Sequence, residues 1–238
     1  MLAENKIKKL FESFPFESLR DTSKNKLLII ACSDRKIAGN EICERNYFNS
    51  ESYKYLKALR ELRRFNYIDY INSNSNEYLM IKDINGNGNL TSIDSCYFIN
   101  SLKTNTPNLK PAVERYDGIF YSYDLKNLYF KKNRESNLHI LIVSGLYGIL
   151  EFRDGIIDYH FNIKNGPKIW SNCLTNTINQ YISENEIDND SVFYSLSDEY
   201  LKNITPNSAW KNIWIKNGGL GSLQTSAKFL KEYFLPNL

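Results

Sequence analysis

Continuous apolar runs alternate along this chain with amphipathic stretches. The runs at residues 26–32, 138–143 and 191–196 predict strands that are buried on both faces. Apolar residues that recur every three to four positions predict helices at residues 1–13, 50–65, 169–182 and about 222–234. Strands that alternate with helices indicate an α/β protein with a mostly parallel central sheet flanked by helices.

The pattern loosens in residues 66–110, where Asn85–Asn89 is typical of a turn or an exposed loop. We interpret this segment as an insertion with one or two short strands. The simplest domain organisation is a single domain over residues 1–238, which is long enough to bury a full core.

Composition narrows the class of protein. Apolar residues make up 42% of the chain and charged residues 24%, and no apolar run approaches the length of a membrane span. The N-terminal stretch is amphipathic and charged rather than a signal peptide. We therefore expect a cytoplasmic protein that does not bind membranes.

The chain has few candidate metal ligands. Its four cysteines are widely spaced without a C-x-x-C pair, and it has two histidines, His139 and His160. This set favours neither a structural zinc site nor disulfides, and we expect no metal and no cofactor.

The net charge of +3 does not make the chain a polycation, but basic residues cluster at Lys57–Arg64 and Lys131–Arg134. Each cluster could contact phosphates or could be a solvated helix face. Gly218–Ser222, before the last helix, suits a helix-start turn better than a phosphate cradle, because it lacks the lysine of a nucleotide loop.

Polar and aromatic residues follow all three predicted strands. Because the carboxyl ends of parallel strands share one edge of a sheet, these residues are expected to line one cleft. The candidates after the first strand are Cys32, Ser33 and Lys36; after the second, Ser144, Gly145, Tyr147, Gly148, Asp154 and Tyr159; and after the third, Ser197, Glu199 and Tyr200.

Each candidate has a chemical and a structural interpretation. Asp154 could be a general base, or it could form an Asx-turn or cap a helix. Lys36 could bind phosphate, act as an amine nucleophile or lie on the surface. Cys32 could be a nucleophile, although a buried packing role is more common for cysteine. Tyr147 and Tyr159 could stack on a base or simply pack.

The second strand end also resembles a known family. Gly145–Tyr159 is similar, without a gap, to the signature G-L-Y-G-[VL]-L-R-P-L-D-x-[IM]-x-P-Y of the YaaA peroxide-stress proteins, and Trp170 follows as in that family. Leu196–Tyr200 resembles the later family segment L-A-S-x-E-Y. The chain departs from the signature at Glu151-Phe152, where the family has Arg-Pro.

The first strand end differs as well. The family has Ser-Pro-Ala-Lys where this chain has Ala31–Lys36, and the resulting C-S-x-x-K start resembles a neighbouring branch that includes the lysine-transfer domain of archaeosine synthase. By resemblance, the YaaA proteins bind DNA and limit damage under oxidative stress, and the wider fold looks like the uracil-DNA-glycosylase type.

The leading hypothesis is a YaaA-like stress or defence protein that acts on nucleic acid or nucleobases. As an enzyme it would be a metal-independent base N-glycosidase or a base-modifying transferase, with catalytic roles for Asp154, Lys36, Ser33 and Cys32. The alternatives are a non-enzymatic DNA-binding protein of oxidative stress and a small-molecule nucleotide hydrolase or transferase. The oligomeric state and the choice among DNA, RNA and free nucleotide stay open.

Overall fold

The computed structural model describes residues 2–14, 19–37, 80–81, 91–92, 110–145, 147–156, 163, 173–216 and 220–238. The longer elements are the helices α1 (Leu2–Ser13), α6 (Tyr123–Glu135), α8 (Cys173–Glu184) and α10 (Leu220–Phe229) and the strands β1 (Lys26–Ala31), β7 (Leu138–Ser144), β8 (Gly148–Glu151) and β10 (Val192–Ser195). The short strands are β2 (Arg35–Lys36), β3 (Met80–Ile81), β4 (Thr91–Ser92), β5 (Lys110–Pro111), β6 (Tyr116–Asp117), β9 (Gly155–Ile156) and β11 (Lys211–Asn212). The short helical segments are α5 (Ala112–Arg115), η1 (Ile119–Tyr121), η3 (Asn189–Ser191), α9 (Asp198–Leu201), η4 (Leu230–Phe234) and η5 (Leu235–Asn237).

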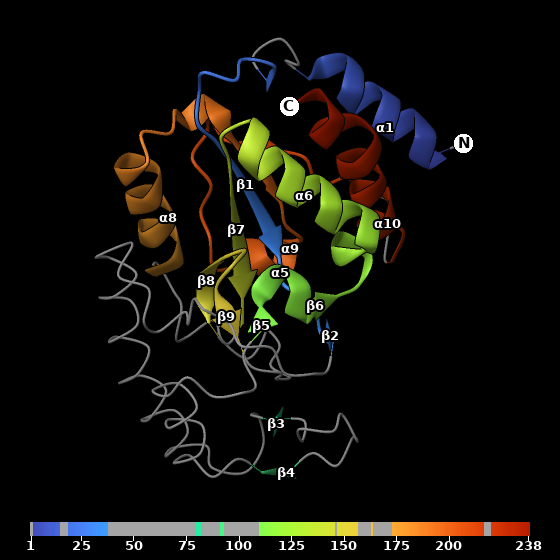
Figure 1. Ribbon diagram of the computed structural model, residues 1–238. Helices are drawn as coiled ribbons and strands as arrows, with labels where there is room; N and C mark the ends of the chain where they lie inside the picture. Colours follow the sequence, from blue (N-terminus) through green and yellow to red (C-terminus); the bar gives the residue numbers. More distant parts are fainter. Residues whose placement is uncertain are drawn as a thin grey trace.

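A five-stranded sheet with the order β11-β10-β1-β7-β8 forms the centre of the fold (Figure 1). β1 pairs in parallel with both β10 and β7, and β10 pairs in parallel with β11. β8 is antiparallel, because it returns from β7 through a tight turn. All six residues of β1 are buried, as expected for a central parallel strand. The predicted α/β class and the mostly parallel sheet are confirmed.

Helices cover both faces of the sheet (Figure 1). Leu28 pairs with Phe193 and with Ile140, so these side chains share one face. On that face the ring of Phe193 contacts Phe14 at a centroid distance of 5.6 Å and Phe234 at 5.0 Å. α1, α6 and α10 lie on this side, whereas α8 lies on the other side.

The predicted elements are found with shifted boundaries. The first helix ends at Ser13 as expected, the helix predicted over 169–182 is α8, and the last helix begins at Leu220 and passes into η4. In the proposed insertion, β3 and β4 form a short antiparallel pair. The predicted helix at 50–65 and the turn at Asn85–Asn89 lie outside the described residues.

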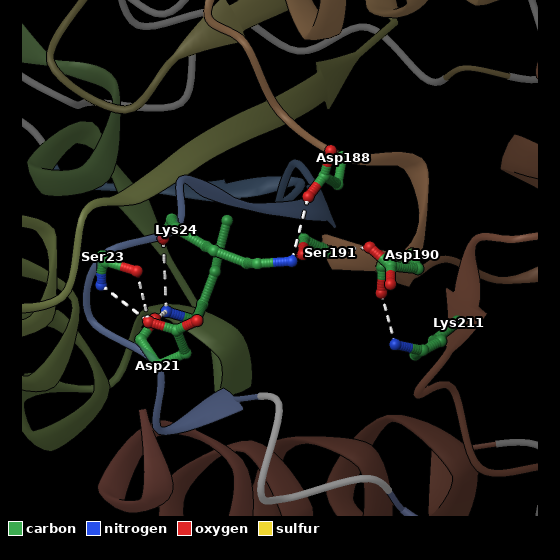
Figure 2. Close-up of polar contacts among 8 residues, drawn as sticks. Asp21, Ser23, Lys24, Asp188, Asp190, Ser191 and Lys211 are labelled. Carbon is green, nitrogen blue, oxygen red and sulfur yellow. Dashed lines mark hydrogen bonds and ion pairs between the residues drawn. The ribbon is translucent and has the colours of Figure 1, made fainter.

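The amino-terminal edge of the sheet is joined by polar contacts between loops (Figure 2). Lys24 forms an ion pair of 3.2 Å with Asp188, and Lys211 donates to the backbone carbonyl of Asp190. Asp21 accepts hydrogen bonds from the backbone N–H and the hydroxyl of Ser23, which lowers the pKa of Asp21. Exposed pairs of this kind contribute little free energy, so the core rather than this edge stabilises the sheet.

The phenol of Tyr129 on α6 provides a test of this core. Its side chain is fully buried, and its hydroxyl has no hydrogen-bond partner among the described residues. We expect Tyr129→Phe to raise the free energy of unfolding by about 1 kcal/mol at neutral pH, because an unsatisfied buried hydroxyl is removed. Urea denaturation measures the difference.

Burial also raises the pKa of Tyr129 above its ordinary value of 10.0. The folded state then keeps a proton that the unfolded state releases, so this group's contribution to stability is lost as the pH rises above about 10. Tyr129→Phe should therefore flatten the alkaline loss of stability, whereas the same change at the exposed Tyr123 should not. Equal alkaline slopes in the wild type and Tyr129→Phe would refute this assignment.

Candidate functional site

The parallel register brings the predicted site residues of the strand ends together. Ala31 pairs with Val143, and the N–H of Cys32 donates to the carbonyl of Val143 at 2.9 Å, so Cys32 and Ser144 lie side by side. From α9, the short helix after β10, the hydroxyl of Tyr200 lies 3.4 Å from the Cys32 sulfur. Residues from the ends of β1, β7 and β10 thus meet at one edge.

The loop after β1 is held by its own side chains. The Ser33 hydroxyl donates to the backbone carbonyl of Asp117 and accepts the N–H of Arg35 at 3.2 Å. The Lys36 ammonium donates to the carbonyls of Ser33 at 3.0 Å and Asp34 at 3.4 Å. It also lies 5.4 Å above the ring of Tyr116. Ser33 and Lys36 therefore shape the rim of the site.

Two tyrosines that the sequence analysis did not single out, Tyr116 and Tyr121, line the same place. Tyr121 donates its hydroxyl to the carbonyl of Ala31 at 2.6 Å, and its ring lies 5.3 Å from the ring of Tyr116. Both are almost fully buried. Tyr200 contacts the Cys32 thiol and Tyr121 bonds to the residue before it, so we call Cys32, Tyr116, Tyr121 and Tyr200 the thiol–phenol cluster.

The electrostatics of the cluster favour neutral groups. Burial raises the pKa of the Cys32 thiol, although the Lys36 ammonium, the Tyr200 hydroxyl and the backbone N–H of Gly145 oppose this shift. Burial also raises the pKa of Tyr121 and Tyr200. The thiol and the phenols are therefore protonated at neutral pH, and the nucleophilic thiolate is disfavoured.

The tight turn after β7 is stabilised by Ser144. Its hydroxyl accepts the N–H of Tyr147 at 3.0 Å, and Ser144 pairs with Gly148 across the turn. Gly148 has a φ of 71°, a conformation that favours glycine. The Ser144–Gly145 segment therefore presents the Gly145 N–H to the Cys32 thiol.

Asp154 closes a second turn. It is fully buried, and one carboxylate oxygen accepts the N–H of Glu151 at 2.8 Å, while the Asp154 N–H returns to the carbonyl of Glu151 at 3.1 Å. Its own carbonyl accepts the N–H of Ala112 at 2.8 Å. The turn-forming interpretation of Asp154 thus has direct geometric support, and its role as a general base stays a prediction.

The third strand end leads into α9, which carries Glu199 and Tyr200. The carbonyl of Ser197 accepts the N–H of Tyr200 at 3.0 Å, but the Ser197 side chain makes no capping hydrogen bond. Tyr200 joins the thiol–phenol cluster, and Glu199 is the residue before it on α9. Tyr159, His160 and Trp170 lie outside the described residues.

No group of three or more His, Cys, Asp or Glu side chains in the described ranges could hold a metal ion. Within those same ranges, no helix is long and apolar enough to cross a bilayer.

The fold and the site define an α/β protein whose polar and aromatic side chains gather at the carboxyl edge of a mostly parallel sheet. Residues 26–233 match the family described as "Peroxide stress protein YaaA", and the chain belongs to this family. The resemblance inferred from the turns after β7 and β10 is therefore confirmed.

Two curated relatives match a shorter part of the chain. Both are described as "UPF0246 protein": one from Polynucleobacter necessarius subsp. necessarius (strain STIR1) is 29% identical over 116 residues, and one from Janthinobacterium sp. (strain Marseille) is 28% identical over 116 residues. Each match covers 44% of this chain and 44% of the relative, so less than half of either relative's length is spanned.

Gly118 tests how the site is assembled. Its φ is 132°, and a Cβ atom at this position would lie 2.8 Å from the Ser33 hydroxyl oxygen. We expect Gly118→Ala to lower the free energy of unfolding by about 1–3 kcal/mol, because the backbone is strained and the Ser33 side chain must move. Urea denaturation measures the loss.

The control is the same substitution in a Ser33→Ala background. Removal of the hydroxyl relieves the collision but not the backbone strain, so Gly118→Ala should cost less there. An equal cost in both backgrounds would contradict a direct contact between Gly118 and Ser33.

Proposed function

We propose that this protein acts on nucleic acid or nucleobases during peroxide stress, through a base-binding pocket at the carboxyl edge of the sheet. The thiol–phenol cluster is the observation that carries the proposal. It supplies aromatic side chains and a few fixed polar groups, which suit a flat, uncharged base better than a phosphate. The family description, a peroxide-stress protein, supports the physiological setting.

The proposed chemistry is at the base or at its N-glycosidic bond. In glycosidase action, water adds to the anomeric carbon, the carbon–nitrogen bond breaks and the base leaves with a proton. Asp154 would activate the water or stabilise the sugar cation, and Lys36 with Ser33 would hold the base or a phosphate. A base-modifying transfer is the alternative reaction, and a fold of the uracil-DNA-glycosylase type belongs to the same proposal.

Product analysis tests this proposal. The protein is incubated with DNA, RNA and nucleosides, both normal and modified, and mass spectrometry detects released base or new adducts. We expect turnover in the wild type and a loss of at least about a hundredfold in Asp154→Asn, as for removal of an acid–base group. Turnover should also fall in Lys36→Ala, which removes a group that holds the base or a phosphate.

Lys9→Ala is the matched control for Lys36→Ala, because Lys9 is an exposed lysine on α1. Thermal melting of each variant separates lost chemistry from lost folding, which matters for Asp154 because it closes a turn. Absence of any released base or adduct would refute the enzymatic proposal.

A specific observation also favours nucleic-acid binding without catalysis. Tyr123, Asn127, Lys131 and Arg134 follow one another at helical spacing on α6, and all four are exposed, Tyr123 by 79%. No ion pair joins Lys131 or Arg134 to another described residue, whereas Asp124 on this helix is paired with Lys231. This stripe offers one stacking ring and two cations to a nucleic-acid strand.

The stripe makes a salt-dependent prediction. Binding of a labelled oligonucleotide, measured by fluorescence anisotropy at several salt concentrations, should weaken in Lys131→Gln and Arg134→Gln. The slope of log K against log salt should fall by about one for each substitution, because each cation neutralises one phosphate. Lys9→Gln should leave the slope unchanged, and unchanged slopes in all variants would exclude the stripe as the binding surface.

A further inference from the structure

A chain of three polar side chains crosses the sheet face beneath α8. His139 on β7 lies with its Nδ1 atom 2.9 Å from the hydroxyl of Tyr181 on α8. The Tyr181 hydroxyl donates in turn to Glu151 Oε1, at the end of β8, at 3.3 Å. Tyr181 is 2% exposed and Glu151 7% exposed, so the chain leads from a half-buried imidazole to a buried carboxyl group.

These hydrogen bonds end at Glu151, in the turn that contains Asp154. Glu151 is the first residue of the turn, and its N–H donates to the Asp154 carboxylate. On the opposite side, α5 donates the N–H groups of Ala112 and Val113 to the carbonyls of Asp154 and Phe152. The turn is therefore held by backbone bonds from α5 and by a side-chain bond from α8.

We propose that His139 and Tyr181 are positioning residues for the candidate site: through Glu151 they hold the 151–154 turn, and with it Asp154, in place. This inference rests on the proposed function, because Asp154 is the group that it positions. Glu151 stands where the family signature has arginine, so an anchor built on a carboxyl group distinguishes this chain from that signature.

The direction of the hydrogen bonds determines the tautomer of His139. A phenol has one proton, and Tyr181 gives it to Glu151. Tyr181 can then only accept from His139, so Nδ1 carries a proton. Burial lowers the pKa of His139, which favours the neutral ring with Nδ1 protonated and Nε2 unprotonated.

Nuclear magnetic resonance tests the tautomer without any substrate. The full chain is labelled with 15N, and long-range proton–nitrogen correlations report the protonation of each ring nitrogen at neutral pH. The protein has two histidines, so His139→Asn assigns the signals. We expect a protonated Nδ1 and an unprotonated Nε2 at His139. The reverse pattern would overturn the proposed hydrogen bonds from His139 through Tyr181 to Glu151.

The amide proton of Glu151 reports directly on the turn. In Tyr181→Phe, which keeps the ring and removes the hydroxyl, we expect this amide to exchange with solvent about tenfold faster, the effect of one net hydrogen bond. Tyr233→Phe, which removes a phenol hydroxyl from η4, is the matched control and should leave the Glu151 amide unchanged. An unchanged Glu151 amide in Tyr181→Phe would overturn the positioning role.

Rescue distinguishes hydrogen bonding from packing. His139→Asn retains an N–H donor close to the position of Nδ1, whereas His139→Leu retains only bulk. Slow exchange of the Glu151 amide should survive in His139→Asn and be lost in His139→Leu; equal behaviour of the two variants would overturn the role of His139.

The two proposals fail in different measurements. Calorimetry measures nucleoside binding by the wild-type protein. This measurement reports on the proposed function and needs no variant of the protein. If the wild-type protein binds no nucleoside, the proposed function is contradicted. The amide-exchange and tautomer results can still support the positioning roles of His139 and Tyr181.

Discussion

The register of β1 between β10 and β7 is the constraint on which the rest of the structure depends. Both neighbours are parallel to β1, so all three strands end at the same edge. The pairing of Ala31 with Val143 sets Cys32 beside Ser144. A shift by one residue would turn Cys32 to the opposite face and remove it from the Tyr200 hydroxyl. The hydrophobic run of β1 thus determines the geometry of the candidate site.

The site is built by segments that return to this edge from elsewhere in the chain. β6 pairs with β2, and the residues after it bring Tyr121 back to the carbonyl of Ala31. The close approach of Gly118 to Ser33 makes this return possible. On the other side, α5 and α8 hold the Asp154 turn. Rigid elements, rather than free loops, therefore orient the described part of the site.

The sequence alone predicted the sheet well, because an uninterrupted apolar run as short as 26–31 is typical of a strand that is buried on both faces. It also predicted that Cys32, Ser144 and Tyr200 would converge, since parallel strand ends share an edge. It missed Tyr116 and Tyr121, because their place depends on a chain reversal at Gly118 that no periodicity reveals. It also left the role of Asp154 open, because a turn-forming and a catalytic aspartate have the same local sequence.

The charges at the site favour one kind of ligand over another. The Lys36 ammonium lies beside the thiol–phenol cluster, where it already donates to two backbone carbonyls and lies over the ring of Tyr116. A phosphate would compete with these contacts, whereas a neutral base would need none of them to break. Burial keeps the thiol of Cys32 and the phenol of Tyr200 protonated, so these two groups can donate hydrogen bonds to the acceptor atoms of a base. In our proposal the base therefore enters the cluster, and the phosphates of a nucleic-acid strand stay outside it.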